Sequence, residues 1–376
     1  MSEHSLIVQT SFIGDTVLTT PLIAELAERG PVDVVVTPAS ASLLAHDPRI
    51  RRLFIYDKRG RDRGMAGLRR LARDVARESR STDRGSAVAR RTAYLAQGSV
   101  RSAALALLAG YRKRVGFESS AARFLYTDTI SYDRALHHAE RLWSLARPKG
   151  AARGTASMPA PRLFPGDAER AAVDALLPPS DDRRPLVALA PGSVWGTKRW
   201  PYYPELAARL AERCRMVIVG SSDDASAAAA IVRSAAPQGV VDATGKLSLL
   251  ASAEAIGRAD LLVSNDSSPQ HLASAMSTPT ITIFGPTVPA FGFGPLAPNS
   301  ITLGHPTLPC RPCHHHGPPT CPLGHWKCMR ELDVDVVEAA VGEGLRKKAT
   351  GHRKQETGTA QDGTHSREGG DPCWIE

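Results

Sequence analysis

Short apolar runs alternate with amphipathic stretches along the first part of the chain. Residues 15–29 are typical of the amphipathic kind, because Val17, Leu18, Leu22 and Leu26 recur at helical spacing. Strands alternating with helices predict βαβ units and a mostly parallel sheet. The predicted strands are 6–9, 32–37, 53–56, 93–96 and 114–117, and the predicted helices are 15–29, 40–46, 65–77, 100–109 and 137–146.

The same alternation restarts after a break in the pattern. Residues 147–162 are rich in Pro, Gly, Ala and Arg, which indicates a linker between domains. The fold class is therefore α/β, with two Rossmann-like domains that face each other across a cleft. Beyond the linker the predicted strands are 186–190, 216–220, 240–242, 261–264 and 280–284, and the predicted helices are 168–177, 203–213, 226–235, 249–256, 269–276 and 334–347.

The pattern also sets the domain boundaries that we expect. Residues 79–91 are polar and predict a loop in the first domain, and residues 348–376 are polar and Gly-rich, which predicts a disordered tail. The expected boundaries are 1–150 for the first domain, 151–167 for the linker, 168–332 for the second domain, 305–329 for a Cys-rich insertion within it, and 333–347 for a C-terminal helix.

Charge is distributed unevenly along the 376 residues, whose net charge is +9. Residues 51–116 hold 18 Lys and Arg against 5 Asp and Glu. This excess indicates an anionic partner, which is a nucleic acid, an acidic membrane surface or a phosphorylated acceptor; a solvated Arg-rich surface is the alternative. The start of the chain lacks the regions of a signal peptide, and no run of about 18 apolar residues occurs, so we expect a cytoplasmic protein.

One loop between a predicted strand and a predicted helix combines small residues with cations. It reads APGSVWGTKRWP, residues 190–201, and offers hydroxyls on Ser193 and Thr197 beside the cations Lys198 and Arg199. Backbone N–H groups at a helix start and fixed cations both favour anions. The loop therefore predicts a phosphate-bearing ligand, with an ordinary basic turn as the alternative.

Two further stretches place polar side chains at strand ends that face the same cleft. Asp15 follows the first strand, where it is either a helix N-cap or a carboxylate that accepts a proton from a hydroxyl. Residues 265–271 read NDSSPQH and open a helix, so Asp266, Ser267 and Ser268 either cap it or form an anion site with its free N–H groups. His271 lies in the first turn, in a structural or a chemical role.

Cysteine is concentrated in the insertion, which reads CRPCHHHGPPTCPLGHWKCM at residues 310–329. Cys310, Cys313, Cys321 and Cys328 are interspersed with histidines, and both residue types ligate zinc. The second pair departs from the usual spacing of a zinc site. A structural zinc site and a loop packed by sulfur and proline therefore both stay open.

Taken together, four separated motifs resemble one known family. IGDTVLTTP, APGSVWGTKRWP, SNDSSPQHLASAM with TPTITIFGPT, and CRPC with CPLGHWKCM are similar to the ADP-heptose:lipopolysaccharide heptosyltransferases of glycosyltransferase family 9. The resemblance spans roughly residues 5–347 in consistent order. It implies a GT-B fold and metal-independent, inverting transfer of heptose from ADP-L-glycero-D-manno-heptose to the lipopolysaccharide inner core, as its second heptose.

The resemblance also implies roles for single residues. Asp15 occupies the position of the catalytic base, and Lys198 that of a lysine on the donor phosphate. Ser268 stands where the family commonly has Gly, so its role is open. The expected donor-binding residues are Ser193, Thr197, Lys198, Asp266, Ser267, Ser268 and His271, and the expected acceptor contacts are Arg101 and His138.

The implied partners are ADP-heptose and a Kdo-bearing lipid A core at the cytoplasmic face of the inner membrane. We expect a monomer that needs no cofactor and binds no nucleic acid. Three alternatives stay open: a sibling enzyme that adds the first or third heptose or another sugar, an inactive nucleotide-sugar-binding homologue, and a basic, zinc-containing nucleic-acid-binding protein. The last lacks the aromatic residues interleaved with basic ones that such proteins use.

Overall fold

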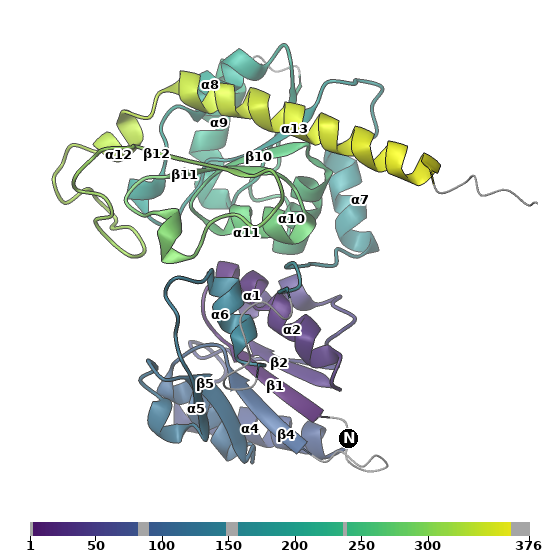
Figure 1. Cartoon of the computed structure of the whole chain (residues 1–376), viewed down its shortest axis with the longest axis vertical. Helices are drawn as coiled ribbons and strands as arrows, with labels where there is room; N and C mark the ends of the chain where they lie inside the picture. Colours follow the sequence, from purple (N-terminus) through teal and green to yellow (C-terminus); the bar gives the residue numbers. More distant parts are fainter. Residues whose placement is uncertain (1–2, 82–89, 148–156, 236–238, 362–376) are drawn as a thin grey trace, which may run out of the picture.

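The computed structural model describes residues 3–81, 90–147, 157–235 and 239–361, and in it two parallel sheets stack end to end (Figure 1). The first sheet has the strand order β3-β2-β1-β4-β5-β6 and the second β12-β11-β10-β7-β8-β9. The two orders are the same when each domain is counted from its own first strand. The predicted α/β class and two-domain plan are confirmed.

The first domain alternates strands and helices as expected. Its strands are β1 (Glu3–Gln9), β2 (Val32–Val36), β3 (Arg52–Ile55), β4 (Arg90–Leu95), β5 (Lys113–Phe117) and β6 (Asp128–Ile130). Its helices are α1 (Ile13–Leu18), α2 (Thr20–Ala27), α3 (Pro38–Ala41), η1 (Ser42–Leu44), α4 (Gly64–Ser81), α5 (Val100–Leu108), η2 (Arg123–Leu125) and α6 (His138–Ser144).

The second domain repeats the plan and adds a long terminal helix. Its strands are β7 (Leu186–Ala190), β8 (Arg215–Ile218), β9 (Val240–Asp242), β10 (Leu261–Asn265), β11 (Thr280–Phe284) and β12 (Ile301–Gly304). Its helices are α7 (Asp167–Leu176), η3 (Gly196–Lys198), α8 (Tyr203–Leu210), η4 (Ser222–Asp224), α9 (Ala225–Ser234), α10 (Leu249–Arg258), α11 (Ser268–Met276), η5 (Pro289–Phe291), α12 (Lys327–Arg330) and α13 (Val334–Gln361).

Strand order places one switch point in each sheet. In the first domain, β2 and β3 extend the sheet on one side of β1, and β4 begins its extension on the other side. In the second domain β8 and β9 lie on one side of β7, and β10 lies on the other. Every residue of β7 and β10 is buried, as expected where helices cover both faces of a parallel sheet. Ligands of such sheets bind beyond the carboxyl ends of the strands at the switch point.

The domains share apolar packing next to these switch points. α1 of the first domain packs on α11 of the second, and η1 packs on α10. One continuous cluster of buried side chains includes Ile7 and Leu22 of the first domain and Ala188 and Leu262 of the second. This packing therefore holds the carboxyl ends of the strands of one sheet close to those of the other.

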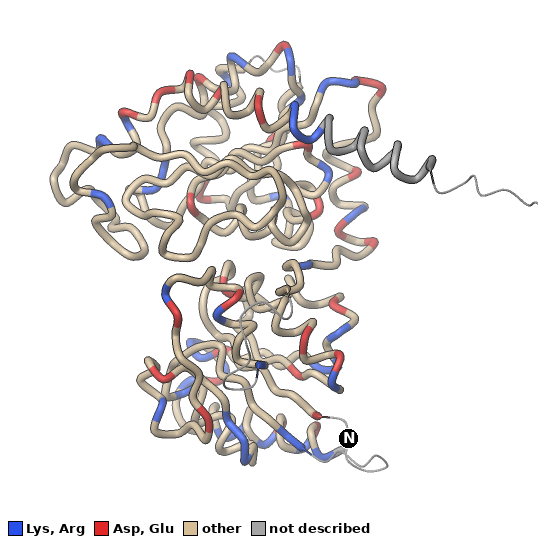
Figure 2. The backbone as a smooth tube through the Cα atoms, viewed as in Figure 1, with Lys and Arg blue, Asp and Glu red and all other residues tan. Residues whose placement is uncertain are grey.

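The basic region lies on the outer side of the first domain, where Lys and Arg recur along the tube in Figure 2. In α4, Leu68, Leu71 and Val75 are buried while Arg69 and Arg73 are exposed. The predicted helix and its apolar face are thus confirmed. Part of the predicted 79–91 loop differs, because α4 continues to Ser81 and β4 begins at Arg90; residues 82–89 lie outside the described ranges.

Three other expectations about elements were wrong. The single helix at 15–29 is two helices, because Pro21 lacks an N–H and stands in the first turn of α2. The expected tail from residue 348 is helical as far as Gln361, since Lys, Ala, Arg and Gln in this polar stretch are good helix formers. The edge strands β6 and β12 were missed because neither is fully buried.

Candidate active site

A cavity of about 590 Å³ opens between the two domains, beyond both switch points. Its walls come from the loops after β1 and β4 on one side and after β7 and β10 on the other. The lining residues used below are Asp15, Phe12, Gln97 and His138 from the first domain, and Ser193, Trp195, Lys198, Asp266, Ser267, Ser268, His271, Thr287, His315 and His316 from the second.

Asp15 lies in the first turn of α1, beyond the end of β1. Its Oδ2 accepts a hydrogen bond from Ser11 Oγ at 2.6 Å and a longer one from Phe12 N at 3.4 Å. Its Oδ1 lies 3.6 Å from His138 Nε2, beyond ordinary hydrogen-bond length. One carboxylate oxygen is therefore oriented by the turn while the other faces the cavity, which suits acceptance of a proton.

Two histidines line the cavity as neutral side chains. Burial lowers the pKa of His138 to about 4 against the opposing effect of Asp15, and burial likewise lowers the pKa of His271 to about 4. The His138 ring packs on Phe293 of the second domain, with centroids 4.8 Å apart. A Cβ on Gly14 would come within 2.6 Å of His271 Cδ2, so only glycine lets α1 approach this ring.

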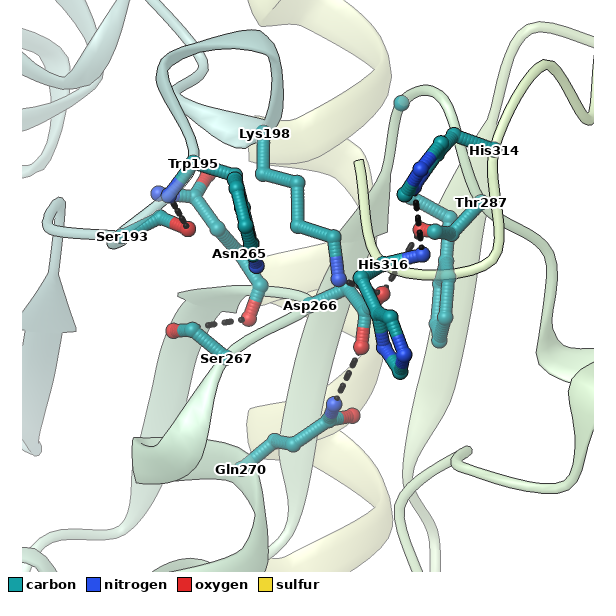
Figure 3. A network of polar contacts seen from close by, with 12 residues as sticks. Ser193, Trp195, Lys198, Asn265, Asp266, Ser267, Gln270, Thr287, His314 and His316 are labelled. Atoms are coloured by element: carbon teal, nitrogen blue, oxygen red, sulfur yellow. Dashed lines mark hydrogen bonds and ion pairs between the residues drawn. The ribbon is translucent and has the colours of Figure 1, made fainter. Parts of the chain in front are cut away.

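Lys198 forms a buried ion pair that sequence reasoning did not predict (Figure 3). Its Nζ lies 2.6 Å from Asp266 Oδ2, and each side chain is 9% exposed. Thr287 Oγ1 donates to the same oxygen at 2.6 Å, and Gln270 Nε2 donates to Oδ1 at 2.8 Å. Asp266 thus holds Lys198 in place and compensates its positive charge. Lys198 therefore acts on a ligand through its N–H donors and contributes little net charge to the cavity.

The loop after β7 is secured from two sides. Asn265 Nδ2 donates to Pro191 O at 2.8 Å and fixes the loop to the end of β10. Thr197 differs from expectation: its hydroxyl donates to Pro318 O at 2.5 Å, and it lies outside the cavity lining. Ser193 does line the cavity, and its Oγ accepts from the backbone N–H of Trp195 at 3.2 Å. Thr197 therefore secures the insertion instead of facing the cleft.

The start of α11 is open toward the cavity. Ser267 is the N-cap residue by position, yet its hydroxyl donates to Gly192 O at 3.3 Å and makes no capping bond. Ser268 begins the helix and also lines the cavity. Pro269 has no N–H, and the N–H of Gln270 donates to Ser267 O at 3.3 Å. The N–H of Ser268 is therefore the one that the first three residues of α11 can offer to an anion.

Arg101 lies in a second pocket and not in the main cavity. This pocket, of about 370 Å³, adjoins the main one through Gln97, which lines both. Burial, with help from Arg59 and Arg101, lowers the pKa of Lys58, whose Nζ donates to Thr10 O at 2.9 Å. Sequence reasoning missed Lys58 and Arg59, although their place just beyond the β3 strand marked them as strand-end residues. The other lining residues are Thr10, Tyr56, Ser99 and Ser102.

The Cys-rich insertion is secured by an arginine. Arg311 donates to the backbone carbonyls of Phe284, Gly285 and Thr287. Cys310 Sγ lies 3.8 Å from His325 Nε2. Within the described ranges, no three His, Cys, Asp or Glu side chains are gathered closely enough to hold one metal ion. The four cysteines, Cys310, Cys313, Cys321 and Cys328, are all free thiols.

Comparison with known proteins now adds to this geometry. The family model for glycosyltransferase family 9 (heptosyltransferase) matches residues 88–326. Lipopolysaccharide heptosyltransferase 2 of Escherichia coli is 28% identical over 302 residues, which are 76% of this chain and 84% of that protein.

Two solved structures share the fold over nearly their whole length. A glycosyltransferase family 9 structure from Veillonella parvula has a TM-score of 0.77 at 21% identity, covering 92% of this chain and 97% of that one. The E. coli ADP-heptose lps heptosyltransferase II has a TM-score of 0.74 at 22% identity, covering 93% and 100%. The two-domain fold is GT-B, and the nucleic-acid alternative is not supported. This chain belongs to glycosyltransferase family 9 and is a glycosyltransferase.

Proposed function

We propose that this protein transfers heptose from ADP-heptose to the inner core of lipopolysaccharide. The names of its relatives support the donor and the product class. The observation that carries the proposal is the cavity itself, in which Asp15 of one domain and the Lys198–Asp266 pair of the other line opposite walls. An acceptor hydroxyl and a nucleotide-sugar anomeric carbon meet between them.

In the proposed reaction the acceptor hydroxyl oxygen attacks C1 of heptose from the face opposite the nucleotide. Asp15 takes the hydroxyl proton as the new C–O bond forms, and the bond from C1 to the ADP oxygen breaks with its electron pair on ADP. The product linkage is inverted. General-base catalysis of this kind contributes about 10²–10⁴-fold.

The departing diphosphate is stabilised by donors on the second domain. Lys198, with its ammonium group, and Ser268, with its backbone N–H at the start of α11, line the same cavity. Donors placed where charge develops typically contribute about 3–4 kcal/mol each. These groups belong to the protein, so we propose that transfer needs no metal cofactor. Activity that persists after dialysis against EDTA supports this, and activity lost with EDTA but restored by one metal contradicts it.

Structural zinc in the insertion is a separate proposal, which metal analysis of the purified protein tests. The described arrangement does not gather a ligand set, so the cysteines would have to move together to hold an ion. A stoichiometric zinc content that thiol alkylation abolishes supports the site. A metal-free protein of normal activity contradicts it.

The second pocket is the proposed acceptor subsite. Lys58, Arg59 and Arg101 surround it at the start of α5, and the acceptor that we expect carries phosphates and Kdo carboxylates. Because Gln97 lines both pockets, an acceptor with its hydroxyl at Asp15 can place an acidic group beside Arg101.

Adjacent elements offer a surface for the membrane that carries this acceptor. Exposed apolar side chains occur on α4, α5 and η2, which pack on one another in the basic part of the first domain. Cations near anionic head groups, with apolar side chains beside them, are typical of peripheral binding. No helix in the described ranges is long and apolar enough to span a bilayer. The apolar side chains are Met65, Val100, Leu107, Leu108 and Phe124.

One assay tests the proposed function directly. Purified protein is incubated with ADP-heptose and with core acceptors that carry zero, one or two heptoses, and the products are weighed by mass spectrometry. A mass gain of one heptose on the acceptor with one heptose supports transfer of the second. A gain on another acceptor identifies a sibling specificity, and no gain on any acceptor overturns the proposal. Size-exclusion chromatography with light scattering tests the proposed monomer.

A further inference from the structure

The Cys-rich insertion returns to the active-site cavity between two anchors. Arg311 fixes its first part to the carbonyls of residues 284–287, and Pro318 O accepts the Thr197 hydroxyl. His316 lies between these anchors. Figure 3 shows its ring beside the Lys198–Asp266 pair.

The turn that places His316 depends on the next residue. Gly317 has a φ of +90°, a conformation that other residues rarely adopt. A Cβ there would lie 3.1 Å from Lys198 Cε, so glycine also leaves room for the lysine stem. The backbone N–H of His316 donates to His314 Nδ1 at 2.9 Å, which fixes the turn from the other side. The sequence thus builds a defined position for the His316 ring.

The His316 ring also reaches the first domain. Its centroid lies 6.2 Å from that of Phe12, which is 65% exposed and three residues before Asp15. The ring lies beside the Lys198–Asp266 pair on an exposed residue (Figure 3), and partial desolvation together with the nearby Lys198 ammonium lowers the pKa of His316. The ring therefore lies between Phe12 of the first domain and the Lys198–Asp266 pair of the second.

The ring nitrogens are available to a ligand. Among the described residues, neither ring nitrogen of His316 has a hydrogen-bond partner, and the residue lines the main cavity. The charge of Lys198 is already compensated by Asp266, so a departing diphosphate gains from a further N–H donor. A neutral imidazole always carries one N–H.

We propose that His316 is a substrate-contacting residue whose ring N–H donates a hydrogen bond to the diphosphate of the nucleotide sugar. This inference rests on the proposed function, because it takes the ligand of the cavity to be a nucleoside-diphosphate sugar. It gives the insertion a role in catalysis: it delivers a donor to the cavity that the β7 loop alone does not supply.

Three substitutions separate hydrogen bonding from packing. His316→Phe keeps a ring against Phe12 and removes the N–H. His316→Asn and His316→Gln each keep an amide N–H near the place of one ring nitrogen. Loss of one donor to developing charge costs up to about 10²–10³-fold in kcat. We expect His316→Phe to lower kcat/KM for ADP-heptose about tenfold or more and to weaken ADP binding, while at least one amide variant stays within about threefold of wild type.

His305→Phe is the matched control, because His305 belongs to the same insertion but pairs with Glu331 and does not line the cavity. Thermal unfolding checks that each variant is folded. Wild-type kinetics and ADP affinity in His316→Phe overturn the inference, as does an equal loss in Phe, Asn and Gln variants. If the wild-type protein binds ADP but transfers no heptose, the proposed function fails, and ADP affinity measured by calorimetry still tests His316.

Discussion

Two aspartates, one in each domain, lie beside the switch points and have opposite surroundings. Asp15 follows β1 and Asp266 follows β10, each at a switch point. Asp15 has one oxygen bound by its own turn and one toward the cavity, near a neutral histidine at 3.6 Å. Asp266 accepts from Lys198, Thr287 and Gln270.

This difference favours Asp15 over Asp266 as the proposed base. A carboxylate that already accepts three donors has little capacity left for a substrate proton. A carboxylate with one oxygen free retains that capacity. The sequence motif around Asp266 is the longer of the two, yet the hydrogen-bond partners leave more capacity for a proton on Asp15.

Asp15→Asn tests the difference between the two aspartates most directly. The amide keeps the shape and cannot take the proton, so we expect kcat to fall by about 10²–10⁴-fold with ADP affinity and unfolding temperature near wild type. Steady-state kinetics and calorimetry measure these. If the variant keeps more than about a tenth of the wild-type rate, Asp15 is not the base.

Asp266→Ala should act on stability first. It leaves the Lys198 ammonium buried and unpaired, which typically costs about 3–5 kcal/mol. We expect a lower urea midpoint together with weaker ADP binding. Lys198→Ala is the comparison, since it leaves Asp266 with two neutral donors and should reduce rate and ADP affinity with less loss of stability. Asp266→Ala with unchanged stability would show that the two aspartates do not differ as described.

The buried histidines predict how stability depends on pH. Burial lowers the pKa of His138 and of His271 to about 4, below the ordinary value of 6.5, so the unfolded chain takes up protons first as pH falls. Their contribution is present above about pH 6.5 and is lost as pH falls toward 4, by about 2 kcal/mol for each at pH 5. Urea midpoints at pH 7, 6 and 5 measure it.

His271→Asn should flatten that pH dependence. An equal slope in wild type and His271→Asn would mean that His271 titrates as in the unfolded chain.

Sequence patterns predicted the fold and the meeting of Asp15, Lys198, Asp266 and His271, because parallel strands bring their carboxyl-end residues to one edge. The contacts that these residues make could not be predicted from the sequence. The Lys198–Asp266 pair joins positions 68 apart, and the Thr197–Pro318 bond joins positions 121 apart. Such contacts depend on how the loops pack, and loop packing leaves no periodic pattern in the local sequence.

Arg101 illustrates the same limit at smaller scale. Its place at the start of α5 was predictable, but the loop after β3 that brings Lys58 and Arg59 around it was not, so one acceptor residue was expected where the structure has a basic pocket. The comparison between the domains then extends from their aspartates to their cations: Lys198 is neutralised by a carboxylate, whereas Lys58 has a backbone carbonyl as its partner.

Lys58→Ala and Arg101→Ala test whether the cations of the second pocket bind the acceptor. Each removes a cation that the proposed acceptor meets, and a hydrogen bond to a charged group contributes about 1.5–3 kcal/mol. We expect KM for the acceptor to rise about tenfold at low salt, with KM for ADP-heptose unchanged. Arg233→Ala, which removes an exposed cation from α9, is the charge-matched control. Because salt screens such contacts, the difference should shrink as ionic strength rises; an effect independent of salt, or one shared by Arg233→Ala, would remove the basic pocket from acceptor binding.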